Sequence, residues 1–288
     1  MASSKHHYIP KFYLENFTNA EGKFYIYLVK EDRFKKNGEL FSPKSHFFEE
    51  GGNTIFWEDT ANDHLELAYA ELDSRVANIF NQIKYSNDPG YGLSSKDMPL
   101  LQFFVAHLFW RNPVNDEFSQ FLLKEIGLGS TGMTLKNLKT NEVIEDSEFE
   151  KKLVENESAY KMVKHWIPYE MYPTLLQNTT PLNLTRFDVG EKPTLLSDNP
   201  LIVKSPAIFD IYRDDFILPV TKDIYFSRMN TGEMYQNDAC IYIDALLLKQ
   251  ANKFVATTNM NYINLLKNSR EYSLSKEELV DIIFTKLS

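Results

Sequence analysis

The sequence predicts an α+β fold with a predominantly helical first half, a small and mainly antiparallel sheet in the second half, and a C-terminal helix. Three observations support this prediction. Apolar residues recur at helical spacing between residues 60 and 112. From residue 183 onward the pattern changes to short apolar and β-branched runs separated by turn residues. Residues 275–278, Ser-Lys-Glu-Glu, have the form of a capping box that starts a last helix.

The N-terminal region is expected to contain a short helix and a strand. Pro10 suits the first turn of a helix that carries aromatic side chains as far as residue 17. After a turn at residues 19–22, residues 23–30 alternate as a strand does, and this strand is a candidate to join the later sheet. Residues 31–59 hold glycine and proline among aromatics, which predicts a loop-rich segment with short strands at best.

Helices are expected from residue 60 to residue 177. Residues 60–85 have the period of an amphipathic helix. The next helix opens near Ser94 and stops at Pro113, and its apolar character nearly all round predicts the central core helix. Two more helical regions are expected at residues 116–126 and at residues 147–177, the second interrupted at Pro168 and Pro173.

The second half is expected to alternate strands and helices. Short strands are predicted at residues 183–189, 194–196, 201–203, 216–220 and 224–227. Helices are predicted at residues 238–254, at residues 259–268 and from residue 276 to about Leu287. The chain of 288 residues fits one elaborated domain, with residues 1–178 as a mostly helical subdomain and residues 179–288 as a subdomain of sheet plus helices.

Charge and cysteine content exclude several classes of protein. The chain has 31 basic and 40 acidic residues, and its formal charge of -9 opposes attraction to nucleic acid or anionic lipid. The lone Cys240 excludes an internal disulfide and a cysteine cluster for zinc. No signal-peptide core and no run of about 18 apolar residues is present. We therefore expect a soluble, cytoplasmic protein without a membrane partner, and the net charge does not favour nucleic acid as a partner.

Two adjacent imidazoles, His6 and His7, come directly before the aromatic helix. Either ring could bind a metal or move a proton near neutral pH. Adjacent side chains of an extended segment point to opposite sides, so joint ligation of one ion is disfavoured. Alternatively, one ring pins the terminus through a hydrogen bond to a carbonyl or carboxylate. The aromatic segment, which includes Tyr13, is also a candidate docking surface for a protein partner.

Two helices carry further candidates. His107 and Arg111 lie four residues apart on the predicted core helix and share a face. A guanidinium there needs a partner, either a structural acid or the anionic group of a ligand. On the preceding helix Glu66 lies beside the apolar stripe through Leu65 and Leu72, which makes it the favoured inward-facing carboxylate. Solvated acids are the alternative.

A polar turn separates two apolar runs at residues 197–200, Ser-Asp-Asn-Pro. Asp198 and Asn199 could cap backbone amides there, or project a carboxylate and an amide into a cleft. Oxygen ligands of this kind also hold divalent cations. A divalent metal, with His7 and Asp198 as ligands, is therefore one cofactor hypothesis.

Three pieces of the chain together resemble one family. They are HHYIPKFYL at residues 6–14 with Phe17 and Gly22, Arg111-Asn112-Pro113, and Leu196 to Pro200 followed by Leu218-Pro219-Val220. This pattern is similar to the bacterial domain of unknown function numbered 4238, over nearly the whole chain. The resemblance implies a shared architecture and a recurring polar constellation without assigning a reaction. It marks His6, His7, Pro10, Tyr13, Arg111, Asp198, Asn199 and Pro200 as matching positions, whereas Val220 stands where members more often have Leu.

Three functional hypotheses follow. The first is a hydrolase, such as a metal-dependent nuclease, with His6 or His7 as ligand or base, Asp198 as carboxylate partner and Arg111 neutralising an anionic transition state. Ligand contacts would come from Tyr13, His107, Asn199 and Glu66. The second is a non-catalytic binding or regulatory module, as in a defence or mobile-element gene cluster. In the third, the same residues form a purely structural polar network.

Overall fold

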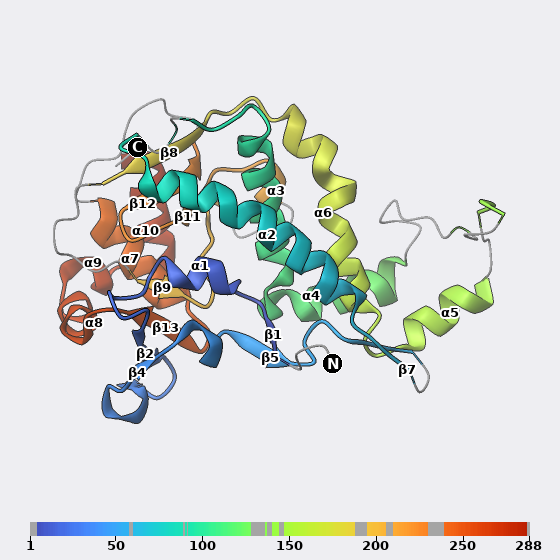
Figure 1. The fold of residues 1–288 in the computed structure, drawn as a ribbon, viewed down its shortest axis with the longest axis horizontal. Coiled ribbons are helices and arrows are strands. Elements are labelled where there is room, and N and C mark those ends of the chain that lie inside the picture. Colours follow the sequence, from blue (N-terminus) through green and yellow to red (C-terminus); the bar gives the residue numbers. More distant parts are fainter. Residues whose placement is uncertain are drawn as a thin grey trace.

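A computed structural model describes residues 5–57, 60–88, 90, 92–127, 136, 140–143, 147–187, 195–205, 210–229 and 239–286 (Figure 1). The strands are β1 Lys5–His7, β2 Phe24–Leu28, β3 Arg33–Phe34, β4 Leu40–Phe41, β5 Phe48–Glu50, β6 Ile55–Trp57, β7 Thr60–Asn62, β8 Leu182–Arg186, β9 Leu196–Ser197, β10 Ile202–Val203, β11 Phe216–Pro219, β12 Ile224–Arg228 and β13 Phe254–Thr257.

Helices occur along the whole described chain. The α-helices are α1 Lys11–Glu15, α2 His64–Tyr85, α3 Asp97–Arg111, α4 Asp116–Phe121, α5 Ser147–Glu155, α6 Tyr160–Gln177, α7 Ala239–Gln250, α8 Met260–Lys267, α9 Arg270–Ser273 and α10 Lys276–Asp281. Shorter turns are the 3-10 turns η1 Lys35–Asn37, η2 Pro43–Ser45, η3 Pro113–Asn115 and η6 Asp210–Tyr212, and the π-helical turns η4 Leu122–Ile126 and η7 Ile282–Lys286.

The prediction of a predominantly helical first half is wrong. Strands β1–β7 all lie before residue 63, whereas helices are spread over both halves. Each of these strands is two to five residues long. A strand of two or three residues offers too few alternating positions to leave a periodic signal. Its partner, and not its own sequence, therefore decides whether it forms.

Every strand pairing in the described chain is antiparallel, as predicted. One sheet has the order β3-β2-β13-β9 with β4 also beside β2, and a second has the order β10-β11-β12-β8. The N-terminal strand β2 therefore does join strands of the second half, since Tyr25 pairs with Thr257 and Leu28 with Phe254. Sequence reasoning missed β13, because the helix predicted to reach residue 254 ends at Gln250.

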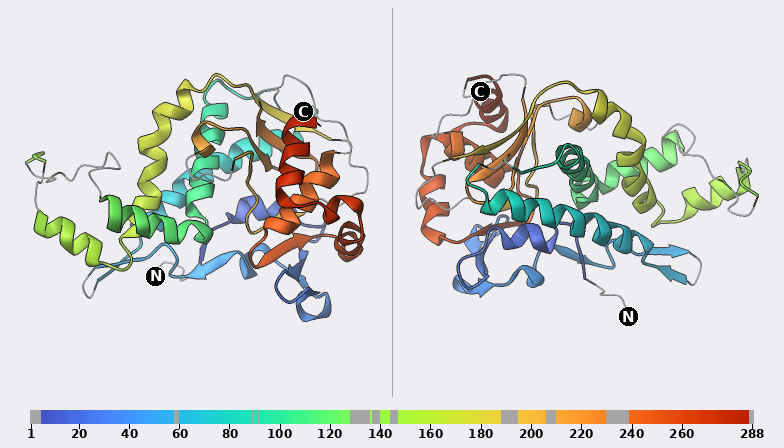
Figure 2. Two further views of the ribbon diagram at one scale, coloured as in Figure 1. Left: turned by 180° about the vertical axis from the view of Figure 1, so that it is seen from behind. Right: turned by 45° about the horizontal axis from the view of Figure 1, so that its top comes forward.

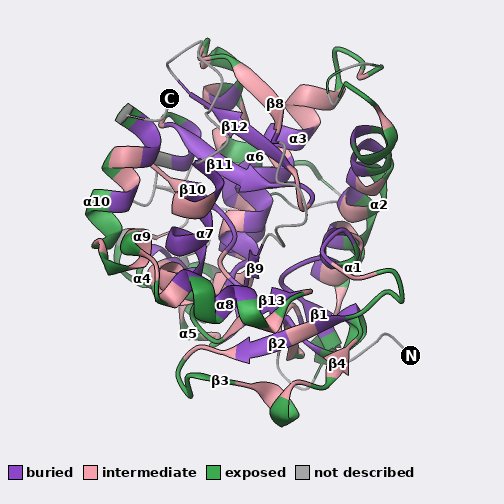
Figure 3. Ribbon diagram, turned by 90° about the vertical axis from the view of Figure 1, so that its left-hand side faces the viewer, coloured by how far each residue is buried: buried purple, intermediate pink, exposed green. Residues whose placement is uncertain are grey.

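The two larger sheets form a middle layer between two sets of helices (Figure 2). Along β11, Phe216 and Leu218 pack into one core cluster, while Ile217 between them packs into the other. Because successive side chains of a strand point to opposite faces, β11 contributes residues to both core clusters. Helices α1, α2, α3 and α6 contribute to the first cluster, and α7, α8 and α10 contribute to the second. Burial is accordingly continuous through β11, β12 and α7 (Figure 3).

Two helices differ in how well their sequences predicted them. Helix α3 is buried at Leu101, Phe104 and Trp110 among others, which confirms it as a core helix. Helix α6 runs without a break through Pro168 and Pro173, so the predicted interruption does not occur. No described helix is both long and apolar enough to cross a membrane.

The N-terminal aromatic segment belongs to the core. Tyr8, Tyr13 and Phe17 are 6%, 0% and 1% exposed. The Tyr13 hydroxyl donates a hydrogen bond to the carbonyl of Pro219, which ties α1 to the end of β11. These rings are packed against other elements, and they do not provide an exposed surface on which a partner could dock.

The Tyr13 hydrogen bond leads to a stability prediction. Tyr13→Phe leaves the buried Pro219 carbonyl without its donor and is expected to lower the free energy of unfolding by about 1 to 2 kcal/mol. Tyr25→Phe is the matched control, because Tyr25 is half-buried on β2 and its hydroxyl has no hydrogen bond within the described chain. Urea unfolding measures both, and equal losses in the two variants would contradict the assignment.

Candidate functional site

The strand pair β1–β5 separates the two adjacent histidines. His6 pairs with Glu49 and His7 pairs with Phe48, and opposed residues of an antiparallel pair share a face. His6 and Glu49 line a polar cavity. His7 points to the other face, where its Nε2 lies 3.3 Å from the Pro43 carbonyl oxygen. Burial lowers the pKa of His7 to about 4, so a neutral ring pins the strand.

The cavity has a volume of about 20 Å³, which is room for one or two water molecules. Its lining comes from segments that are distant in the sequence: β1 and β5, the turn after β5, and helices α2, α3, α4 and α6. The lining residues are His6, Tyr8, Glu49, Gly52, Asn53, Tyr69, Arg111, Pro113, Asp116, Tyr160, Lys161 and Lys164.

A backbone hydrogen bond fixes which ring nitrogen of His6 is the acceptor. The backbone N–H of Asn53 donates to His6 Nδ1 at 2.9 Å, so the ring hydrogen resides on Nε2. The same Asn53 donates its side-chain amide to Glu66 at 2.7 Å. The half-buried Glu66 therefore helps to position the turn that orients His6, and it does not itself line the cavity. Nε2 of this 2%-exposed histidine has no partner within the described chain.

Arg111 lines the cavity and has one donor without an acceptor among the described residues. Its Nη1 contacts both carboxylate oxygens of Asp73 at 2.9 and 3.0 Å, and the guanidinium carbon lies 4.5 Å from the centre of the Tyr69 ring. Asp73 is therefore a structural acid for Arg111, which is one of the two kinds of partner that the sequence left open. The buried Nε–H of Arg111 has no acceptor in the described part of the molecule. An unpaired buried donor costs about 1 to 3 kcal/mol unless water or a ligand accepts from it.

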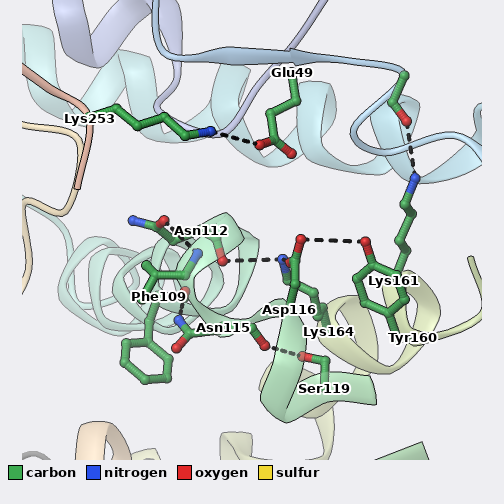
Figure 4. Close-up of polar contacts among 12 residues, drawn as sticks. Glu49, Phe109, Asn112, Asn115, Asp116, Ser119, Tyr160, Lys161, Lys164 and Lys253 are labelled. Atoms are coloured by element: carbon green, nitrogen blue, oxygen red, sulfur yellow. Dashed lines mark hydrogen bonds and ion pairs between the residues drawn. The ribbon is translucent and has the colours of Figure 1, made fainter. Parts of the chain in front are cut away.

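Helix α6 supplies the opposite wall (Figure 4). Lys164 is buried and donates to the Asp116 carboxylate and to the Asn112 carbonyl. Tyr160 lies one turn earlier and donates to the other Asp116 oxygen at 3.4 Å. Burial lowers the pKa of Lys164, an effect that the adjacent carboxylate opposes. Lysine, carboxylate and phenol thus form a connected group at the floor of the cavity.

Lys161 of α6 links this wall of the cavity to the turn after β5. Its ammonium donates to the carbonyls of Gly51 and Thr54 at 3.1 and 2.9 Å, in the turn that carries Asn53. Glu49 of β5, which also lines the cavity, is paired with Lys253 at 3.5 Å (Figure 4). Within the described residues Lys161 has no carboxylate at ion-pair distance, whereas every other charged residue of the lining has an oppositely charged partner. The cavity therefore has an excess of positive charge.

Asp198 has a structural role outside this lining. Its carboxylate accepts from the backbone N–H groups of Asn252, Lys253 and Phe254 at 2.8, 2.6 and 3.0 Å. Burial raises its pKa, and the three amides oppose that shift. Its carbonyl accepts from the Asn112 side chain at 2.8 Å. The turn thus caps amides, which is one of the two roles that its sequence left open.

His107 belongs to a separate buried cluster. Its ring lies 5.5 Å from that of His165, and both rings pack edge-on against Tyr69 and lie near Tyr169. Neither nitrogen of His107 has a hydrogen-bond partner among the described residues, and Nδ1 of His165 has none either. Burial lowers the pKa of His165 to about 4 and that of His107 well below its usual value. Both rings are neutral in the folded protein.

Of the residues chosen from sequence, the structure thus brings together His6 and Arg111, with Glu66 behind them. His7, Asp198, Tyr13, His107 and Asn199 lie elsewhere. Sequence reasoning missed Glu49, Asp73, Asp116, Tyr160, Lys161 and Lys164. Two of these had a signal: Asp73 adjoins Leu72 of the apolar stripe just as Glu66 does, and Lys164 sits between apolar residues on a predicted helix. Glu49 and Asp116 had none, because loop and helix-start carboxylates are usually solvated.

The described residues do not support the metal hypothesis. Among them, no group of three or more His, Cys, Asp or Glu side chains could hold a metal ion. His7 and Asp198 in particular are each committed to backbone groups, at Pro43 and at residues 252–254 respectively.

Comparison with known proteins gives one match. The model of a family described as "Protein of unknown function (DUF4238)" matches residues 5–272. No curated protein and no solved structure matches the chain. The matched segment includes the whole lining of the cavity.

The neutral histidines predict acid sensitivity. In the unfolded chain His107 and His165 titrate near 6.5, whereas their folded pKa values are lower. The unfolded state therefore binds more protons at these two rings, so their contribution to stability is complete above about pH 6.5 and falls as the pH drops toward 4. Each histidine contributes about 1.4 kcal/mol per pH unit to this slope.

Urea unfolding between pH 4.5 and 7 measures that slope. His165→Phe keeps the ring packing and removes one titrating group, so we expect a shallower dependence on pH. His64→Phe is the control, because His64 is exposed on α2. An unchanged slope in the His165→Phe protein would show that its ring already takes up a proton in the folded state.

Proposed function

The chain belongs to the DUF4238 family, whose description assigns no activity, and we propose from the geometry that it is a ligand-binding protein whose cavity receives a carboxylate group. The observation that carries this proposal is a pair of buried donors, His6 Nε2–H and Arg111 Nε–H, that lack acceptors among the described residues and belong to side chains lining one cavity. Two such donors match the two oxygens of a carboxylate.

Size and charge favour the same class of ligand. A polar cavity of about 20 Å³, with room for one or two water molecules, suits a small polar group such as a carboxylate. Lys161 supplies one positive charge without a carboxylate partner within the described chain, which suits a monoanion. Glu49 and Asp116 at the same cavity disfavour a dianion. The remainder of the ligand would lie outside the cavity.

This proposal agrees with the hypothesis of a non-catalytic binding module, but it assigns binding to different residues. Recognition rests on a buried polar cavity, which Tyr8 helps to line, and not on an exposed aromatic surface. A cytoplasmic location, expected from the lone cysteine, stays a prediction.

Formate is the probe, because it is the smallest carboxylate. At constant ionic strength, replacing chloride by formate is expected to raise the free energy of unfolding by about 1 kcal/mol once formate exceeds its dissociation constant several-fold. His6→Phe removes the Nε2 donor and should abolish this increment. His7→Phe changes the adjacent ring, which faces away from the cavity, and should preserve it. Urea unfolding gives the increment for each protein; an identical increment in the His6→Phe protein would refute the assignment.

Hydrolysis is a second candidate function, favoured by one specific arrangement. Donors that lack an acceptor in the resting state resemble an oxyanion hole, and the cavity also holds two carboxylates, Glu49 and Asp116, at a volume suited to a water molecule. One carboxylate would take a proton from that water as it attacks an ester carbonyl, while Arg111 and His6 stabilise the developing oxyanion.

Release of p-nitrophenol from p-nitrophenyl acetate tests this second function. Glu49→Gln is expected to lower the rate at least 100-fold if Glu49 is the base. Glu50→Gln is the matched control, because Glu50 is the next residue of β5 and does not line the cavity. No rate above background in the unmodified protein rejects hydrolysis of such esters and leaves carboxylate binding as the proposed function.

A further inference from the structure

A second and larger pocket lies on the other side of the η3 turn. Arg111, Pro113 and Asp116 face the polar cavity, whereas Val114 and Asn115 of the same turn line this second pocket. Its volume is about 530 Å³, within the range of about 300–1,000 Å³ that is typical of small-molecule sites. Asn199, predicted from sequence to contact a ligand, lines this pocket and not the polar cavity.

The lining of this pocket is apolar and preformed. Leu201, Leu246 and Phe284 are buried at its floor and come from the start of β10, from α7 and from η7. Phe109 of α3 and Val280 of α10 form half-buried walls. Because regular elements carry most of these side chains, the pocket exists without a rearrangement to open it.

The polar groups at the rim indicate an uncharged ligand. Two basic and two acidic side chains line the pocket, namely Lys204, Lys276, Glu277 and Asp281. The pocket therefore has no excess of positive charge to hold an anion, because Lys204 is paired with Asp215. No hydrogen bond of the Asn199 side-chain amide is found within the described residues, whereas the neighbouring Gln250 amide is bonded to the carbonyls of Asn199 and Leu201. A free amide offers one donor group and one acceptor without charge.

The surroundings argue against a protein partner. A stable protein interface buries about 800 Å² on each side and exposes an apolar centre before binding. Among the residues that line this pocket, Val114 alone belongs to the exposed large hydrophobic residues of the described chain. The apolar surface is therefore inside the concavity, where a small molecule can reach it and a flat protein surface cannot.

We propose that this pocket binds a neutral, mainly apolar small molecule with a hydrogen-bonding group directed at Asn199. This site is independent of the polar cavity, and either assignment can fail without the other.

The probe is N-phenyl-1-naphthylamine, a neutral apolar amine that fluoresces when it leaves water. The unmodified protein is expected to bind one equivalent in a saturable manner. Val203→Trp and Val280→Trp each place an indole at a half-buried wall and should weaken binding at least tenfold. Val143→Trp is the matched control, because Val143 is 53% exposed and lies outside the pocket; it should bind as the unmodified protein does.

Three results would overturn the proposal. They are the absence of saturable binding by the folded protein, equal binding by both wall variants, and a dimer in sedimentation experiments that Val280→Trp disperses. The last result would show that a second copy of the chain covers the pocket. Formate stabilisation measured on the same variants separates the two sites, since a wall variant should lose the fluorescent probe and keep the effect of formate.

Discussion

One buried carboxylate, that of Asp198, organises the polar contacts between the sheet and the helices. It accepts three consecutive backbone amides at the turn that enters β13, and its own carbonyl accepts from Asn112 at the end of α3. The Asn112 carbonyl in turn accepts from Lys164 of α6. This series of contacts connects a β-strand turn to the floor of the polar cavity. Without the carboxylate, three amide donors would be left unsatisfied at one place.

Residues that look alike in sequence differ in how much hydrogen-bonding capacity the fold leaves them. His7 and Asp198 are fully committed to backbone groups, so they hold the structure together. His6 and Arg111 are equally buried, yet each retains one N–H that the described chain does not satisfy. Unused hydrogen-bonding capacity in a residue that lines a cavity distinguishes these two candidate ligand contacts from the structural polar groups, whereas His107 has unused capacity but does not line that cavity.

The sequence predicts those elements whose apolar residues repeat regularly over many positions. It does not predict elements that form only by pairing with a distant segment. The helices around Val76 and Phe104 follow from apolar spacing, and the opposite directions of His6 and His7 follow from strand geometry. The strand at residues 23–30 was also predicted and is observed as β2. The strands β1 and β5 and the strand β13 were not, because each exists through pairing with a distant segment. The same limit applies to the site: Glu49 reaches it only because β1 pairs with β5.

The pairing of β2 with β13 has a consequence for how the protein is made. Phe24 and Ile26 of β2 leave the ribosome early, yet the strand that covers their edge is encoded near the end of the chain. Until β13 emerges, a nascent chain exposes an apolar strand with unpaired backbone groups. Products that terminate before residue 254 keep that strand uncovered for their whole lifetime, which makes them substrates for chaperones and proteases rather than partly active fragments.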